Sequence, residues 1–141
     1  MFNIHIVREM KAVELMIRNI LIVGFGGSLG ALMRYMFSQW IHISDFPLAT
    51  FLVNGLGSFL LSVVTFSVYK NSEGEYWKLF LGTGICGGFT TMSTFALETY
   101  ELFTVQPFVA VIYMTMSMIV GFGGAYVGYQ AALHLGKGTD R

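Results

Sequence analysis

The sequence predicts an all-α membrane protein with four transmembrane helices, and its composition and the spacing of its charges carry that prediction. Hydrophobic residues make up 55% of the 141 residues, charged residues only 11%, and the mean hydropathy is +0.65. A soluble domain of this length needs a more highly charged surface. Stretches without charge cover residues 19–33, 46–69, 79–97 and 102–136. About 20 apolar residues suffice to cross the hydrocarbon core of a bilayer, so four spans fit.

In chain order, we expect a leader, four spans and a tail. Residues 1–16 carry alternating charges, which favours a short interfacial helix or a flexible leader over a cleavable signal peptide. The spans are expected at residues 19–40, 48–69, 78–100 and 108–135, with a disordered tail at 136–141. The connectors, about 42–47, 70–77 and 101–107, leave no room for a second, soluble domain. Residues 17–135 are therefore expected to form one membrane domain.

The third span contains the most informative stretch, GTGICGGFTTMSTF at residues 82–95. Its four glycines lower helix propensity, and a broken helix is tolerated in a membrane only where protein or water satisfies the exposed peptide groups. We therefore expect a break at about 87–91 and an ion site or pore beside it. The alternative is a helix that packs closely through small residues, with hydroxyls bonded to the preceding turn. Packing accounts for Gly84 and Gly88, but it does not require the five hydroxyl side chains.

The second span carries polar side chains at every fourth position, which places them on one helical face. These residues are Thr50, Asn54, Ser58 and Ser62. Interhelical hydrogen bonding is sufficient to explain the serines. Asn54 is different, because its amide carries two donors that must be satisfied in hydrocarbon, and donors are what an anion needs.

Two ionisable residues lie within the expected spans, Arg34 and Glu98. An embedded charge is costly, so each is a functional-site hypothesis by default, and the two side chains are candidates for an ion pair. The alternative is that Arg34 extends to the membrane interface and that Glu98 escapes at a nearby helix end. Neither is joined by a second carboxylate within the expected spans, and no Ser, His and Asp set lies on facing positions, so the sequence gives little support for an enzyme.

Several other site classes have little support. The single cysteine, Cys86, excludes an internal disulfide and a thiolate metal cluster. The three histidines lie at or outside the expected membrane ends and none pairs at ligand spacing, so haem or metal ligation through histidine is not expected. The net charge is zero, which offers no basic face to a nucleic acid.

Basic residues are distributed unevenly between the two sides of the expected topology. The N-terminus, the middle connector and the C-terminus share one side, and they hold Arg8, Lys11, Arg18, Lys70, Lys78, Lys137 and Arg141. The other two connectors hold none. The positive-inside rule then places both termini in the cytoplasm, with Arg34 near the outer end of the first span.

Three segments resemble signatures of one family. They are GGSLGALMRY (Gly26 to Tyr35), PLATFLVNGLGSFLL (Pro47 to Leu61) and GTGICGGFTTMSTFALE (Gly82 to Glu98), and together they cover about 40 residues in three of the four spans. They are similar to the small fluoride channel and exporter family, known as Fluc or CrcB proteins. The fourth span is similar only in its length, its glycines and its scattered polar groups.

The resemblance implies a four-span subunit in an antiparallel dimer, with two narrow pores near the interface and a sodium ion at the centre. It implies passive export of fluoride across the inner or plasma membrane, and so fluoride resistance. By position, the expected pore residues are Asn54, Met92, Thr94, Phe95, Tyr113 and Ser117. The backbone carbonyls of Gly87 and Thr90 match the sodium ligands, and Arg34 and Glu98 are expected in structural or electrostatic roles.

The chain departs from the family pattern at two positions, and its topology leaves two dimers open. Met92 stands where the family usually has a phenylalanine, and a thioether lacks the polarised edge of an aromatic ring. Ala49 replaces a usual glycine, which matters less because alanine is also small. The one-sided basic residues favour a fixed orientation and a heterodimer with an oppositely oriented paralogue. A homodimer is slightly favoured, because some of those charges lie in the termini.

Two other functions remain as alternatives. A small four-span proton-coupled multidrug exporter needs an embedded carboxylate in the first span, where this chain has Arg34. A structural membrane subunit would explain the glycines and hydroxyls, but it would give Asn54, Phe95 and the helix break no purpose.

Overall fold

The computed structural model describes residues 2–41, 46–67 and 74–137, and these residues are helical almost throughout. The elements are α1 (Phe2–Trp40), α2 (Leu48–Ser67), α3 (Gly74–Trp77), the π-helical segment η2 (Lys78–Cys86), α4 (Gly87–Phe89), α5 (Met92–Val105) and α6 (Pro107–Lys137). No strand occurs in these ranges. The all-α prediction is confirmed.

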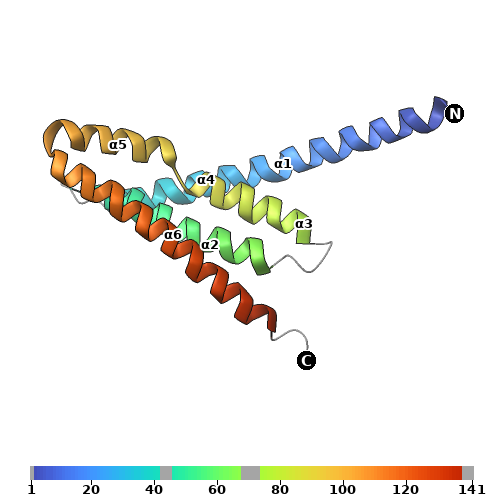
Figure 1. The fold of residues 1–141 in the computed structure, drawn as a ribbon. Helices are drawn as coiled ribbons and strands as arrows, with labels where there is room; N and C mark the ends of the chain where they lie inside the picture. Colours follow the sequence, from blue (N-terminus) through green and yellow to red (C-terminus); the bar gives the residue numbers. More distant parts are fainter. Residues whose placement is uncertain (1, 42–45, 68–73, 138–141) are drawn as a thin grey trace.

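Within the described ranges, three helices are long and apolar enough to cross a membrane. They are found at His5–Trp40, Leu48–Ser67 and Pro107–Leu135 and match the first, second and fourth expected spans. The stretch expected to form the third span, residues 78–100, is divided among η2, α4 and α5, so no single long helix covers it. In Figure 1 the N-terminus, the end of α2, the start of α3 and the end of α6 lie toward one end of the molecule.

The helices pack in two close pairs, α2 against α6 and α1 against η2 and α4 (Figure 1). Glycines allow the second pair to approach until the backbones meet. A Cβ added at Gly26 would lie 2.6 Å from the Phe80 carbonyl oxygen, and one at Gly30 would collide with the Ile85 carbonyl oxygen. Close packing through small residues is a main source of helix association in lipid, because lipid tails are as apolar as the helices and no hydrophobic effect drives the helices together.

Several boundaries differ from those expected. Residues 2–16 are not separated from the first span but continue it as one helix to Trp40. The connector expected at 101–107 shrinks to Gln106, because α5 continues to Val105 and Pro107 begins α6. Proline is favoured at a first helical position and keeps the residue before it out of the helical region. The expected connector residues 42–45 and 70–73 and the tail residues 138–141 lie outside the described residues.

Arg18 of α1 contacts Tyr76 of α3. Its guanidinium lies 4.5 Å from the centre of the Tyr76 ring and donates a hydrogen bond to the Tyr76 hydroxyl. Trp77 follows on the same segment and is 58% exposed. A cation beside exposed aromatic rings is typical of the interface between hydrocarbon and headgroups.

Candidate functional site

The interruption between α4 and α5 consists of two residues, Thr90 and Thr91. Thr90 has φ −72° and ψ 156°, and Thr91 has φ −146° and ψ 117°, so both are extended. Gly87, where the break was expected to begin, is an ordinary helical residue with φ −64° and ψ −38°. Among the glycines of this stretch, Gly88 instead serves the contact with α1, because a Cβ there would collide with the backbone of Gly27.

Asn54 on α2 contacts the backbone of Thr91 at two points. Its Nδ2 donates to the Thr91 carbonyl oxygen at 3.0 Å, and the Thr91 amide donates to Asn54 Oδ1 at 2.8 Å. The Thr91 hydroxyl in turn accepts from the Thr94 amide at 3.2 Å and donates to Thr94 Oγ1 at 2.9 Å. Thr91 therefore caps α5, as threonine commonly does at a helix N-terminus.

The other polar residues of α2 lie on the expected face, but their partners differ. Thr50 donates to Glu98 Oε1 at 2.8 Å on α5, and Ser62 donates to the Ala125 carbonyl at 2.7 Å on α6. Ser58 bonds back to the Asn54 carbonyl within its own helix, as expected for a hydroxyl inside a helix. From Thr50 to Ser62, the polar face of α2 thus contacts α5, then the break, then α6.

A groove of about 340 Å³ runs beside the break and gathers four of the six expected pore residues. These are Asn54, Met92, Phe95 and Ser117. The Ser117 hydroxyl oxygen is buried and has no hydrogen-bond partner in the described part of the chain. Met92 is 74% exposed, so its thioether lies at the open side of the groove. None of the described residues that line the groove is charged.

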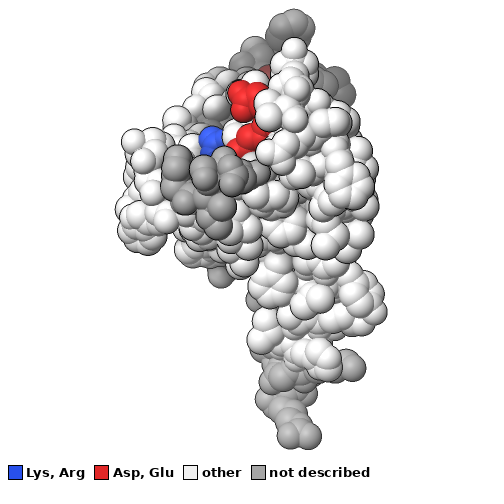
Figure 2. Space-filling view, turned by 90° about the vertical axis from the view of Figure 1, so that its left-hand side faces the viewer, with Lys and Arg blue, Asp and Glu red and all other residues white. Residues whose placement is uncertain are grey.

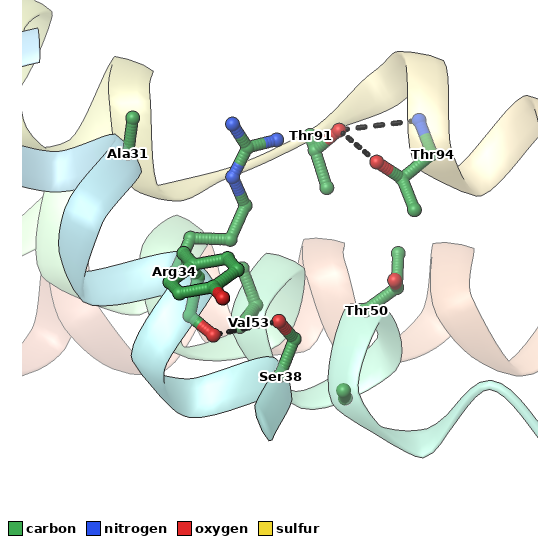
Figure 3. A pocket seen from close by; sticks show the side chains of 9 residues that line it. Ala31, Arg34, Ser38, Thr50, Val53, Thr91 and Thr94 are labelled. Atoms are coloured by element: carbon green, nitrogen blue, oxygen red, sulfur yellow. Dashed lines mark hydrogen bonds between the residues drawn. The ribbon is translucent and has the colours of Figure 1, made fainter. Parts of the chain in front are cut away.

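A second, smaller cavity of about 210 Å³ also has Thr91 in its lining (Figure 3). Arg34 extends into it from α1, and Thr50, Thr91 and Thr94 line it from α2 and the start of α5. Thr94, expected in the pore, therefore lines this cavity and not the groove. The Arg34 guanidinium has no hydrogen-bond or ion-pair partner among the described residues.

Glu98 is held by two hydroxyl groups and forms no ion pair with Arg34, although the structure describes both residues. Its oxygens accept from Thr50 at 2.8 Å and from Tyr113 at 2.9 Å. Tyr113, expected in the pore, is fully buried behind the groove, and its ring lies 5.2 Å from that of Phe95. Tyr113 thus contacts both the carboxylate and the aromatic ring of the groove.

The end of the molecule that carries this cavity is sparsely charged. Figure 2 shows one small basic area close to acidic side chains on this face, and most of the other described surface in view is uncharged. The described residues also contain no group of three or more His, Cys, Asp or Glu side chains placed to hold a metal ion.

Sequence reasoning did not identify Thr91 as the centre of the site or Thr50 as a partner of Glu98. A signal for Thr91 was present, because Thr followed three residues later by a second hydroxyl residue is compatible with a helix start. The contact of Thr50 with Glu98 joins residues 48 apart, and no local pattern predicts it.

Comparison with known proteins assigns the chain to a family. The family model described as "CrcB-like protein, Camphor Resistance (CrcB)" matches residues 21–129. A protein of Oceanobacillus iheyensis named "Fluoride-specific ion channel FluC" is 42% identical over 87% of this chain and 98% of its own length. "Fluoride-specific ion channel FluC 2" of Bacillus subtilis is 46% identical over 75% of this chain and 81% of its own length. The chain is a multi-pass membrane protein and belongs to the CrcB-like family.

Proposed function

We propose that this chain is a fluoride-selective channel subunit that lets fluoride leave the cell passively across the cytoplasmic membrane and so confers resistance to it. The observation that carries the proposal is the uncharged groove at the helix break, which combines Asn54, Phe95 and Ser117. The relatives named as fluoride-specific channels, similar over most of the chain, support the same ion.

The chemistry of the groove suits a small anion. The Ser117 hydroxyl has no hydrogen-bond partner among the described residues, so its proton is available to an anion. Phe95 offers the positive edge of an aromatic ring. Without a fixed positive charge in its lining, the groove attracts an anion weakly enough to release it, which conduction requires.

Arg34 has a different role in this proposal. Its guanidinium, which has no partner among the described residues, lines the second cavity, where it raises the local concentration of anions without lining the groove. Residues 19–40, the part of the first helix expected to cross the membrane, contain no carboxylate, which a proton-coupled cation exporter would need there. The fluoride channel is therefore favoured over the exporter, and a structural subunit would leave the groove without a purpose.

A sodium ion at the break is part of the proposal, because two carbonyls lose their helical donors there. The Thr91 amide, which would reach the Gly87 carbonyl in a continuous helix, donates to Asn54. The Thr94 amide, which would reach the Thr90 carbonyl, donates to the Thr91 hydroxyl. Gly87 and Thr90 thus fit the carbonyl ligands of a hard cation. Such an ion would neutralise these carbonyl dipoles.

We also propose that two copies assemble in opposite orientations, with the break at their interface. Gly87 is exposed and no atom of the described residues lies within 4 Å of a Cβ built there, so packing among these residues gives no reason for glycine. Close approach of a second subunit at the break would explain the glycine. A homodimer is slightly favoured over a heterodimer with a paralogue, although relatives carry the numbered names FluC 1 and FluC 2.

The test is fluoride efflux from liposomes that contain this chain alone, followed with a fluoride electrode. Fluoride efflux is expected to exceed chloride efflux. Efflux that appears only after a second, related subunit is added would replace the homodimer with the heterodimer. Equal fluoride and chloride efflux would contradict fluoride selectivity, and proton-dependent uptake of organic cations would favour the exporter.

A further inference from the structure

The contact between Asn54 and Thr91 joins one side chain to both backbone groups of one residue. The planar carboxamide donates to the Thr91 carbonyl at 3.0 Å and accepts from the Thr91 amide at 2.8 Å. This is the donor and acceptor pattern that two peptide groups exchange in an antiparallel sheet. Asn54 therefore acts on the backbone of the break as a neighbouring strand would.

Thr91 needs such a partner because it is extended, buried and placed between two helices. It is 6% exposed, so water does not replace a lost hydrogen bond. In a continuous helix its amide would donate to residue 87, but the extended conformation prevents this. A buried peptide group without a partner is strongly unfavourable at membrane depth.

The same contact determines where α5 begins. Thr91 is the N-cap of α5, and its hydroxyl bonds both the amide and the side chain of Thr94. A continuous chain of hydrogen bonds thus runs from α2 through Thr91 to the first turn of α5. Phe95 lies on the next turn of that helix and lines the groove.

We propose that Asn54 is a positioning residue, which fixes the backbone of Thr91 and through it the place of Phe95 in the conducting path. Only one of its two Nδ2 hydrogens is used by Thr91, so one remains for the groove. The proposal rests on the proposed channel function for its consequence, but the contact itself is testable without fluoride.

The experiment measures amide hydrogen exchange at residues 90–95 in the full-length chain, in lipid nanodiscs, together with fluoride efflux. Asn54→Ala should accelerate exchange of the Thr91 amide at least about tenfold, with little change elsewhere, and should lower efflux. Ser62→Ala is the matched control. It removes a hydrogen bond of similar length from the same face of α2 to a backbone carbonyl, but far from the break, so exchange at Thr91 and efflux should both be retained.

Asn54→Asp keeps the proposal testable if the alanine variant does not fold. An ionised aspartate still accepts from the Thr91 amide but no longer donates to its carbonyl, so exchange at Thr91 should lie between wild type and Asn54→Ala.

Three results would overturn the positioning role. Reduced efflux with wild-type exchange at Thr91 would make Asn54 a lining group only. Faster exchange at Thr91 with full efflux would show that the contact does not position the path. Exchange that is faster by the same factor throughout the chain would show that Asn54 stabilises the whole fold and has no specific role at the break. Absence of efflux in the wild type would instead contradict the channel function. The ranking of the Thr91 exchange rates among the variants would still decide whether Asn54 fixes the backbone at the break.

Discussion

The segment interrupted at Thr90 and Thr91 has two halves that different chemistry holds in place. The first half, η2 and α4, packs against α1 through glycines, with backbone meeting backbone at Gly30 and Gly88. The second half, α5, is held by polar side chains. Asn54 of α2 contacts the residue at its start, and its own Glu98, further along the helix, accepts from Thr50 of α2. The change from one kind of contact to the other occurs at the break.

Because the contacts differ, the two halves should tolerate different substitutions. Close backbone packing depends on volume, so a single added methyl group is enough to separate the helices. Hydrogen bonds depend on the positions of donors and acceptors, so the second half should accept changes of size more readily than the loss of a partner. The predictions below vary volume in the first half and polarity in the second, from the largest expected effect to the smallest.

The largest effect is expected for Gly30→Ala. The added Cβ would meet backbone atoms of Ile85 and Phe89, which cannot rotate away as a side chain can. We expect a loss of about 3 kcal/mol or more of stability and little folded protein in mild detergent. Gly24→Ala, on the same helix, is the control, because a Cβ there meets nothing within 4 Å. Equal thermal stability of the two variants would disprove the volume argument.

The next effect concerns the acceptor in the second half. Glu98→Ala would leave the hydroxyls of Thr50 and the fully buried Tyr113 without their partner, at a cost of about 2 kcal/mol. Glu98→Gln keeps an acceptor oxygen and should lose much less. The exposed neighbour Glu101→Ala serves as a control for charge. Thermal unfolding followed by size-exclusion chromatography would measure all three, and a Gln variant as unstable as Ala would assign the effect to charge.

A smaller effect on the subunit, but a larger one on assembly, is expected for Gly87→Val. Gly87 is helical, and no atom of the subunit stands within 4 Å of a Cβ built there, so folding should change by less than about 1 kcal/mol. The proposed partner and sodium site lie there, so the dimer fraction and the sodium dependence of its melting temperature should fall. Full retention of both would place the interface elsewhere.

The smallest effect on stability is expected for Met92→Phe. The side chain is 74% exposed at the open side of the groove, so stability should stay within about 0.5 kcal/mol of wild type. A ring adds a polarised edge, and fluoride efflux should rise. Phe95→Ile, with the opposite change in aromatic character, should lower it. Unchanged efflux in Met92→Phe would remove Met92 from the conducting path.

The first half of this comparison could be predicted from the sequence more fully than the second. Apolar runs long enough for a bilayer establish an all-helical membrane fold, and Gly84 and Gly88 at a spacing of four predict close packing. The polar face of α2 also follows from a spacing of four, and the structure places Thr50, Asn54 and Ser62 in contact with neighbouring elements.

The break lies inside the expected residues 87–91, but its position at Thr90 and Thr91 and its partner could not be predicted. Glycine at 87 favoured an interruption there, yet Gly87 is helical, and the extended residues are two threonines. What selects Thr91 is the carboxamide of Asn54, 37 positions earlier. Side-chain contacts with a backbone over that separation leave no periodic signal, so Asn54 was expected to serve an anion alone.

The length of α1 offers a way to observe orientation directly. Its 39 residues extend about 58 Å, roughly twice the thickness of a hydrocarbon core, and Figure 1 shows its N-terminal part projecting beyond the other helices. Met10 lies on this projecting part and is 66% exposed, whereas the single native cysteine, Cys86, is buried. A Met10→Cys variant labelled by a membrane-impermeant reagent in intact cells would therefore report which copies face outward, and a labelled fraction near one half would identify a chain that inserts both ways.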